Sequence, residues 1–291
     1  MFFLIYIYIF LIGLCVGSFL NVVIDRVPKH QKLVKPRSGC PFCKKPLLAK
    51  DLFPLLSFCL LKGKCRFCKN KIDKTLPIVE LLTGLMFVLV FNVGGLGGIG
   101  IINWVEMVYY LAILCILIIV FFMDLKYGVI EDKVVLAGVG LWTLYVLISK
   151  GLFWDATYNN LRTDAFGKYL IKAGFMNNLI FRDLKIVLIS LICAVSLFLF
   201  FYILVAITKG RGMGGGDVKF AFLMGLILGF PKVLPAFFLS FLTGALVSLI
   251  LMLVGKKTMK QTVPFGPFLV TGTVLGLFWG DLIVKWYLGF L

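Results

Sequence analysis

The sequence has few of the side chains that carry hydrolysis in most soluble enzymes. Its 291 residues include a single histidine, His30. Zinc hydrolases of the H-E-x-x-H type need two histidines, so that class is excluded. A serine triad would have to take its base from His30 alone, which nearly excludes that class as well. The chemistry must therefore be sought among the acids and the cysteines.

Charged residues are also scarce. Only 15% of the residues are charged, whereas 61% are hydrophobic, and the mean hydropathy is +1.05. This composition leaves too little polar surface to cover a water-soluble globule. It predicts an all-α polytopic membrane protein.

Eight apolar runs predict about eight transmembrane helices. They cover residues 2–24, 76–93, 104–123, 129–149, 185–207, 217–230, 233–254 and 265–289. Most approach the ~20 residues that are needed to cross a hydrocarbon core of ~30 Å. The first run lacks a basic n-region and a small-residue cleavage site, so a cleaved signal peptide is the weaker alternative. The mixed segment 149–185 is expected to lie as an interfacial helix on the outer leaflet.

The distribution of positive charge predicts the orientation. The net charge is +17, and the segments 25–75, 124–133, 208–217 and 255–264 hold 21 Lys and Arg, against 7 in the alternate segments. The positive-inside rule places the basic segments in the cytoplasm and both termini outside. Basic loops of this kind contact anionic lipid head groups, so membrane lipids are expected partners and nucleic acid is not.

Two cysteine pairs lie in the first basic segment and share the pattern Cys-x-Phe-Cys-Lys. They are Cys40 with Cys43 and Cys65 with Cys68. Four thiolates at this spacing suit tetrahedral zinc, and neighbouring cations help to keep them ionised. Because four sulfur ligands leave no open position, the predicted zinc is structural. Two disulfides or free thiols are the alternative. The other four cysteines are assigned to packing.

A glycine run at residues 94–100 (GGLGGIG) contains a Gly-x-Gly-like pattern, as some nucleotide-binding sites do. No predicted strand precedes it, and the predicted topology places it outside the cell. It is interpreted as a turn.

Acids inside or at the edge of membrane spans are costly, which makes them functional candidates. They are Glu80, Glu106, Asp124, Asp132, Asp217 and Asp281. Glu106 and Asp281 fall at outer helix ends, where a solvated face is the simpler interpretation. Glu80 lies on the cytoplasmic side and is expected to orient the basic loop or to complement a helix N-terminus.

Asp124 and Asp217 share a context, since each lies at the cytoplasmic edge of an apolar run. Each is followed two residues later by a lysine, Lys126 or Lys219. Two carboxylates held close share one proton, so that one activates water and the other polarises a carbonyl. This is the chemistry of an aspartic peptidase. The alternative is that both acids are interfacial helix caps.

The stretch 212–219 (GMGGGDVK) places Asp217 behind a glycine hinge that includes Gly214 and Gly216. The run 217–230 that follows has 14 residues, which gives about 21 Å of helix at 1.5 Å per residue. Unless the helix starts earlier, Asp217 must therefore lie below the membrane surface. Glycine allows close backbone approach there.

Several motifs occur in order along the chain. They are residues 17–28 (GSFLNVVIDRVP), the two cysteine pairs, residues 54–57 (PLLS), Glu80, Asp124, residues 214–219 (GGGDVK) and residues 264–267 (PFGP). Together they resemble the type IV prepilin leader peptidases, membrane aspartic peptidases of the GxGD class. The resemblance extends over nearly the whole chain.

The resemblance implies that Asp124 and Asp217 are the catalytic pair, with Gly214, Gly216, Lys126, Lys219, Asp132 and Glu80 in support. It implies that prepilins or pseudopilins are cut after a glycine, on the cytoplasmic side of a bacterial inner membrane. Many bacterial members with the cysteine loop also methylate the new N-terminus from S-adenosylmethionine. The expected domains are a first transmembrane helix (1–24), a cytoplasmic four-cysteine zinc domain and methyltransferase region (25–75), and a transmembrane peptidase domain (76–291).

One departure concerns the turn after the first aspartate. The family usually has Ile-Pro-Asp, whereas residues 130–132 are Ile-Glu-Asp. Asp132 matches the family aspartate. Whether Asp132 or Glu131 contributes to catalysis or only caps the next helix stays open.

Two other functions are compatible with parts of the sequence. A peptidase without methyl transfer is one, because no residue marks a cofactor pocket. An ion-coupled transporter with a zinc-stabilised loop is the other, and it would use the intramembrane acids as a proton or cation path.

Overall fold

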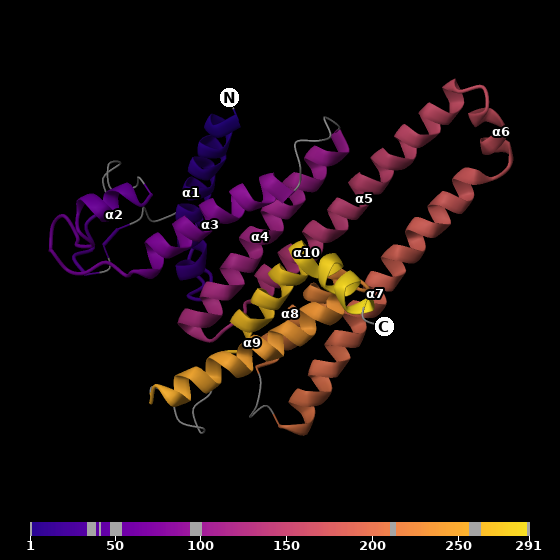
Figure 1. The fold of residues 1–291 in the computed structure, drawn as a ribbon. Coiled ribbons are helices and arrows are strands. Elements are labelled where there is room, and N and C mark those ends of the chain that lie inside the picture. The colour runs from indigo at the N-terminus through magenta and orange to yellow at the C-terminus, as the bar shows by residue number, and fades with distance from the viewer. Residues whose placement is uncertain are drawn as a thin grey trace.

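The computed structural model describes residues 2–33, 39–40, 42–46, 54–93, 101–209, 214–255 and 263–289. Within these ranges the chain is helical, and the only β pairing consists of two isolated bridges. The glycine run 94–100 and the start of the 212–219 stretch lie outside the described residues. The helices are α1 (Phe2–Arg26), α2 (Leu56–Leu60), α3 (Thr75–Val93), α4 (Ile101–Tyr127), α5 (Asp132–Thr163), α6 (Gly167–Lys172), α7 (Phe175–Ile207), α8 (Gly215–Leu228), α9 (Val233–Leu253) and α10 (Gly266–Leu288) (Figure 1).

Seven of these helices are long and apolar enough to cross a membrane, namely α1, α3, α4, α5, α7, α9 and α10. The prediction of an all-helical multi-pass membrane protein is confirmed. The remaining predicted span forms α8, whose 14 residues extend about 21 Å, less than the ~30 Å hydrocarbon core. α8 still reverses the direction of the chain between α7 and α9. In topology it therefore counts as a pass, although it is too short to span.

The centre of the bundle is α4, which packs against α1, α3, α5 and α10. Its residues Ile113, Leu114 and Leu117 have at most 1% of their surface exposed. The short helix α8 is buried to a similar degree, with Phe220 and Leu223 fully enclosed between α7, α5 and α10. Both helices that carry the candidate aspartates are therefore interior elements. The other helices of the bundle shield them from the surroundings.

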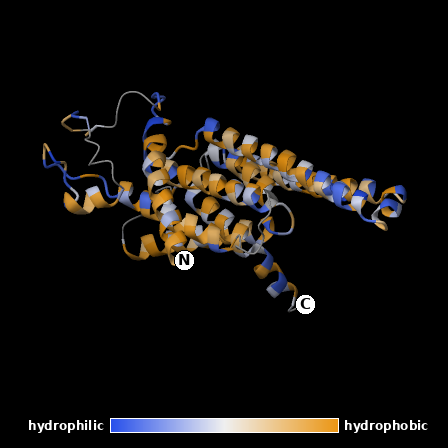
Figure 2. Cartoon of the chain, turned by 90° about the horizontal axis from the view of Figure 1, so that it is seen from above, coloured by the Kyte–Doolittle hydropathy of each residue, from blue (hydrophilic) through white to orange (hydrophobic). Residues whose placement is uncertain are grey.

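The mixed segment 149–185 differs from expectation. It forms the end of α5, the short α6 and the start of α7, a helical hairpin that projects from the bundle (Figure 1). Because α5 has 32 residues, it extends about 48 Å and exceeds a ~30 Å core by about 18 Å. Figure 2 shows hydrophilic residues gathered at the tip of the hairpin and at the cysteine loop, with apolar helices between. The expected separate interfacial helix is wrong.

A buried carboxylate explains why α5 and α7 stay together in the hairpin. Asp183 of α7 is 2% exposed and accepts a hydrogen bond of 2.9 Å from Trp154 Nε1 of α5. Lys150 Nζ lies 3.5 Å from the same carboxylate. A buried carboxylate needs such partners. These contacts hold the two helices together as the hairpin leaves the apolar bundle.

Gly225 allows the close approach of α8 to α7. A Cβ atom at this position would lie 2.4 Å from Ala194 Cα and 2.6 Å from Ala194 N. Both atoms belong to the backbone, so no side-chain rotation can relieve the clash. The position of α8, and with it that of Asp217, depends on this glycine.

We predict that Gly225→Ala destabilises the protein by about 1–3 kcal/mol, the usual cost of overpacking a core. The matched control is Gly140→Ala, because a Cβ atom at that helical glycine meets no atom within 4 Å. Thermal unfolding midpoints of the two variants in the same detergent provide the measurement. If Gly225→Ala unfolds at or above the temperature of the control, the described α7–α8 packing is incorrect.

Candidate functional site

The structure brings the two candidate aspartates together. Asp124 lies in the last turn of α4 and Asp217 in the first turn of α8. Each is 6% exposed, and the Asp124 carboxyl is close enough to act electrostatically on Asp217. Two acids that are distant in the sequence thus form one buried acidic pair. The simple interpretation as separate, solvated helix caps does not describe this arrangement.

The start of α10 holds the Asp124 carboxylate. The backbone N–H of Gly266 donates a hydrogen bond of 3.0 Å to Asp124 Oδ2. A Cβ atom on Gly266 would lie 2.6 Å from the same oxygen, so any side chain there would displace the carboxylate. The 264–267 motif therefore supplies the backbone N–H that donates to Asp124. Because Gly266 has no side chain, it also leaves the space that the Asp124 carboxylate occupies.

Asp217 is positioned by the glycines before it. Gly216 packs against the segment that leads into α5, where an added Cβ atom would lie 2.9 Å from Ile130 Cβ. Gly214 accepts the Asp217 N–H at 3.2 Å and has a φ of −77°, a conformation that is open to any residue. Gly216 therefore allows α8 to approach the segment before α5 closely. The backbone conformation of Gly214, in contrast, does not require glycine.

Lys219 and Asp132 connect α8 to α5 beside the pair. Lys219 Nζ lies 2.5 Å from Asp132 Oδ1, and the two side chains are 49% and 61% exposed. Ion pairs as exposed as this one contribute about 1 kcal/mol or less. Glu131 occupies the N-cap position of α5 without a side-chain cap hydrogen bond. Asp132 thus contacts α8 through a weak, exposed ion pair, and the Glu131 side chain does not cap the helix.

Lys126 connects the Asp124 end of α4 to both ends of the cysteine loop. Its Nζ atom lies 2.9 Å from Asp25 Oδ1 and 3.0 Å from Asp73 Oδ2. Asp25 also accepts a hydrogen bond of 2.9 Å from the Tyr127 hydroxyl. Burial raises the pKa of Asp73, but the hydrogen bonds from Thr75 and Lys126 outweigh it and hold the pKa below its usual value.

Asp73 and Tyr127 were not predicted as site residues, and Asp25 entered only as part of the 17–28 motif. A signal was present, because Asp25 and Asp73 are two of only three acids in a segment with 14 Lys and Arg. Acids kept in so basic a segment suggest specific partners. Their common partner, Lys126, could not be predicted from the sequence, because it lies on α4.

Glu80 lies where the cysteine loop returns to the bundle. Its Oε2 atom accepts the Leu55 N–H at 2.9 Å, and its carboxylate also accepts a hydrogen bond from the Ser18 hydroxyl. Leu55 has a φ of +56°, a conformation that needs stabilisation from its surroundings. Glu80 therefore joins the loop, α1 and α3.

The four cysteines of the loop form one cluster. All of their sulfur atoms lie within 4.8 Å of one another, and the Sγ atoms of Cys40 and Cys68 are 3.7 Å apart. Zinc–sulfur bonds of ~2.3 Å in a tetrahedron place the sulfurs about 3.8 Å apart. A disulfide would need about 2.05 Å, and all eight cysteines of the chain are free thiols. The donor set therefore fits a tetrahedral metal ion.

The repeated sequence pattern gives a repeated local structure. In both cysteine pairs the backbone N–H of the first cysteine donates a hydrogen bond across the turn. Cys40 donates to the Lys45 carbonyl at 3.0 Å, and Cys65 donates to the Asn70 carbonyl at 2.8 Å. The lysine after each second cysteine has a positive φ. The pKa of Cys65 falls to about 6, because the N–H groups of Cys68 and Phe67 donate to its sulfur. Such donors prepare a thiolate for metal binding.

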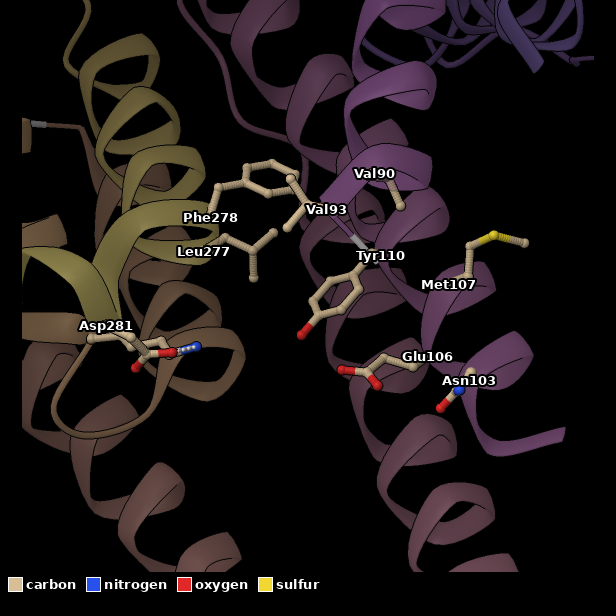
Figure 3. A pocket seen from close by; sticks show the side chains of 10 residues that line it. Val90, Val93, Asn103, Glu106, Met107, Tyr110, Leu277, Phe278 and Asp281 are labelled. Carbon is tan, nitrogen blue, oxygen red and sulfur yellow. Dashed lines mark ion pairs between the residues drawn. The ribbon is translucent and has the colours of Figure 1, made fainter. Parts of the chain in front are cut away.

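A cavity of about 280 Å³ lies at the other end of the bundle (Figure 3). It is lined by Glu106 of α4 and Asp281 of α10 among others. Glu106 precedes Asp124 by five helical turns, about 27 Å along α4. The cavity is therefore separate from the aspartate pair.

Comparison with known proteins yields two family models. Residues 11–93 match the model described as "Bacterial Peptidase A24 N-terminal domain". Residues 111–249 match the model described as "Type IV leader peptidase family". The gap between the two matches, residues 94–110, includes the first ten residues of α4. The cysteine loop thus falls in the first match, and both aspartates fall in the second.

Curated relatives carry one shared name, "Prepilin leader peptidase/N-methyltransferase". A protein of Bacillus subtilis (strain 168) is 30% identical over 96% of this chain and 96% of its own length. A protein of Aeromonas salmonicida (strain A449) is 29% identical over 96% of this chain and 92% of its own. A Myxococcus xanthus protein is 53% identical, but over only 28% of this chain and 24% of its own. No solved structure gives a significant match.

We predict that the purified protein contains about one zinc ion per chain, as a four-sulfur site requires. Cys65→Ser is expected to lose most of this zinc, since three sulfurs bind it far more weakly than four. Cys59→Ser is the matched control, because Cys59 is an exposed free thiol in the same loop. Metal analysis of the three proteins gives the result. Absence of zinc from the unmodified protein, or equal loss in both variants, would reject the site.

Proposed function

The chain belongs to the type IV leader peptidase family, and we propose that it is a bifunctional prepilin leader peptidase and N-methyltransferase. The observation that carries the proposal is the buried pair of Asp124 and Asp217, which two interior helices hold together. The relatives that span nearly the whole chain are named for both activities. Prepilin-type proteins are accordingly the substrates.

In the proposed cleavage, the pair shares one proton. A backbone N–H donor stabilises an ionised carboxylate, and Asp124 accepts such a bond from Gly266. Asp124 is thus suited to take a proton from the attacking water. Asp217 then polarises the scissile carbonyl, and the leaving amine receives a proton as the peptide bond breaks. The products are the leader and a mature chain with a new N-terminal amine.

The length of α8 suits a substrate that is itself a membrane helix. The helix extends about 21 Å, so its acidic end is recessed relative to a full span. A substrate helix beside it would present its first peptide bonds at the depth of the pair. This arrangement supports cleavage just before a hydrophobic segment, after the glycine that the family resemblance implies.

The proposal includes the side of the membrane. The aspartate pair, the cysteine loop and the 264–267 motif lie at the same end of the bundle as the basic segments that the positive-inside rule places in the cytoplasm. We infer that the protein lies in the bacterial inner membrane with its active site facing the cytoplasm. Its basic loops then face anionic lipid head groups, and we propose no role for nucleic acid.

We assign the domains as a first transmembrane helix (1–24), a four-cysteine zinc domain (25–75) and a peptidase domain (76–291). Cys40, Cys43, Cys65 and Cys68 would hold a structural zinc, whose charge neutralises the thiolates and fixes the loop. S-adenosylmethionine supplies the methyl group for the new amine. Among the described residues we identify no pocket for it, and we assign no residue to methyl transfer.

A peptidase without methyl transfer is not favoured, because the relatives that span nearly the whole chain are named for both reactions. An ion-coupled transporter has no observation in its favour beyond the buried acids themselves. The family assignment already accounts for those acids.

We predict that Asp124→Asn and Asp217→Asn each lower the rate of prepilin cleavage by at least about 10⁴-fold, as removal of a group that acts in the transition state does. Asp155→Asn, which changes an exposed acid on α5, should cleave at the normal rate. Methylation of a substrate that was already cut should continue in both variants, which shows that they are folded. Normal cleavage by either variant would refute the pairing.

We also predict that Gly266→Ala lowers cleavage strongly, by roughly 10²-fold, the effect of displacing a reacting group by about 1 Å. The added methyl group would lie 2.6 Å from Asp124 Oδ2. Gly151→Ala is the control, since its Cβ atom meets nothing within 4 Å. Steady-state cleavage kinetics should show the loss in kcat. A Gly266→Ala enzyme as active as the control would mean that α10 does not position Asp124.

A further inference from the structure

The cavity at the end of the bundle opposite the aspartates has no part in the proposed reaction. Its volume is about 280 Å³, and its walls come from α3, α4, α10 and the turn before α9. Figure 3 shows Glu106 and Tyr110 on one wall and Asp281 on the facing wall. Volumes of small-molecule sites start near 300 Å³. The cavity therefore suits a small polar group better than a whole amphiphile.

The position of the cavity along the bundle identifies its surroundings. Glu106 and Asp124 lie about 27 Å apart along α4, close to the ~30 Å thickness of the hydrocarbon core. If the aspartate pair is at one boundary of the membrane, the polar end of the cavity is at the other. This is the level of lipid head groups.

The charges of the lining do not cancel. Lys232 Nζ pairs with Asp281 Oδ2 at 2.7 Å. Within the described part of the chain, Glu106 forms no ion pair with a cation, and its carboxylate interacts with the Tyr110 hydroxyl. The three charged side chains leave one net negative charge in the cavity. A ligand with a positive group would compensate it.

The polarity of the walls changes with depth. Glu106, Lys232 and Asp281 lie at the boundary, whereas Val90 and Leu277 line the cavity nearer the middle of the bundle. A phospholipid has the same order of polarity, from charged head group to acyl chain. The lining also offers both signs of charge, which matches a zwitterion better than an anion.

We propose that this cavity binds the head group of a phospholipid that carries a primary ammonium group, of the phosphatidylethanolamine type. The ammonium group pairs with Glu106, and the phosphate lies near Lys232. The acyl chains remain in the bilayer beside the apolar wall. The lipid fills the gap between α3, α4 and α10, and its ammonium group compensates the charge of the Glu106 carboxylate locally.

Native mass spectrometry of the full chain in detergent tests this proposal, with phosphatidylethanolamine, phosphatidylcholine and phosphatidylglycerol added in turn. We expect the unmodified protein to retain phosphatidylethanolamine about fivefold better than phosphatidylglycerol, a difference of about 1 kcal/mol. Glu106→Gln should abolish this preference, and Glu106→Lys should favour the anionic lipid. Asp155→Asn is the matched control and should leave the preference unchanged.

Three results would overturn the proposal. The first is equal retention of phosphatidylethanolamine and phosphatidylglycerol by the unmodified protein, and the second is a preference that persists in both Glu106 variants. The third is displacement of the lipid by free phosphoethanolamine at similar concentration, which would assign the cavity to a soluble amine. Cleavage of a prepilin-type substrate by the Glu106 variants at the normal rate shows that they are folded, since Glu106 lies far from Asp124.

Discussion

The structure depends on keeping two carboxyl groups together at the edge of a membrane. Like charges at short distance repel, and removal from water makes ionisation costlier still. Asp124 and Asp217 stay close together because the packing of α4 and α8 within the bundle fixes their positions. The backbone N–H of Gly266 offsets part of the cost at Asp124. The tight contacts at Gly216 and Gly225 bring α8 against its neighbours, so the glycines of this chain fix distances more than they provide flexibility.

The cysteine loop is bound to the same framework at several points. Glu80 holds the loop backbone at Leu55, and Lys126 pairs with an acid at each end of the loop. Lys126 follows Asp124 by two residues on α4, so the loop and the candidate catalytic helix share one set of ion pairs. This set of ion pairs keeps the cysteine loop beside the aspartate pair.

The two ends of the bundle carry different features. One end carries the basic loops, the cysteine cluster and the aspartate pair, and the other carries the cavity and the projecting α5–α7 hairpin. The hairpin is held by Asp183 with Trp154 and Lys150. The mixture of aromatic and charged residues in this segment predicted a helix at the membrane surface. The segment instead forms a helical hairpin in which Phe166, Tyr169 and Phe181 stay exposed.

The sequence alone determined the class of fold, the apolar helices, the two cysteine pairs that form one cluster and the identity of the two candidate aspartates. These properties depend on composition and on short spacings, which the order of residues contains directly. Only the tertiary structure decided which groups meet across helices: Gly266 with Asp124, Lys219 with Asp132, and Lys126 with Asp25 and Asp73. It also decided that α5 and α7 continue as a hairpin and that Glu106 faces a cavity. Such contacts join residues far apart in the chain, and apolar runs of similar composition do not specify which helix packs against which.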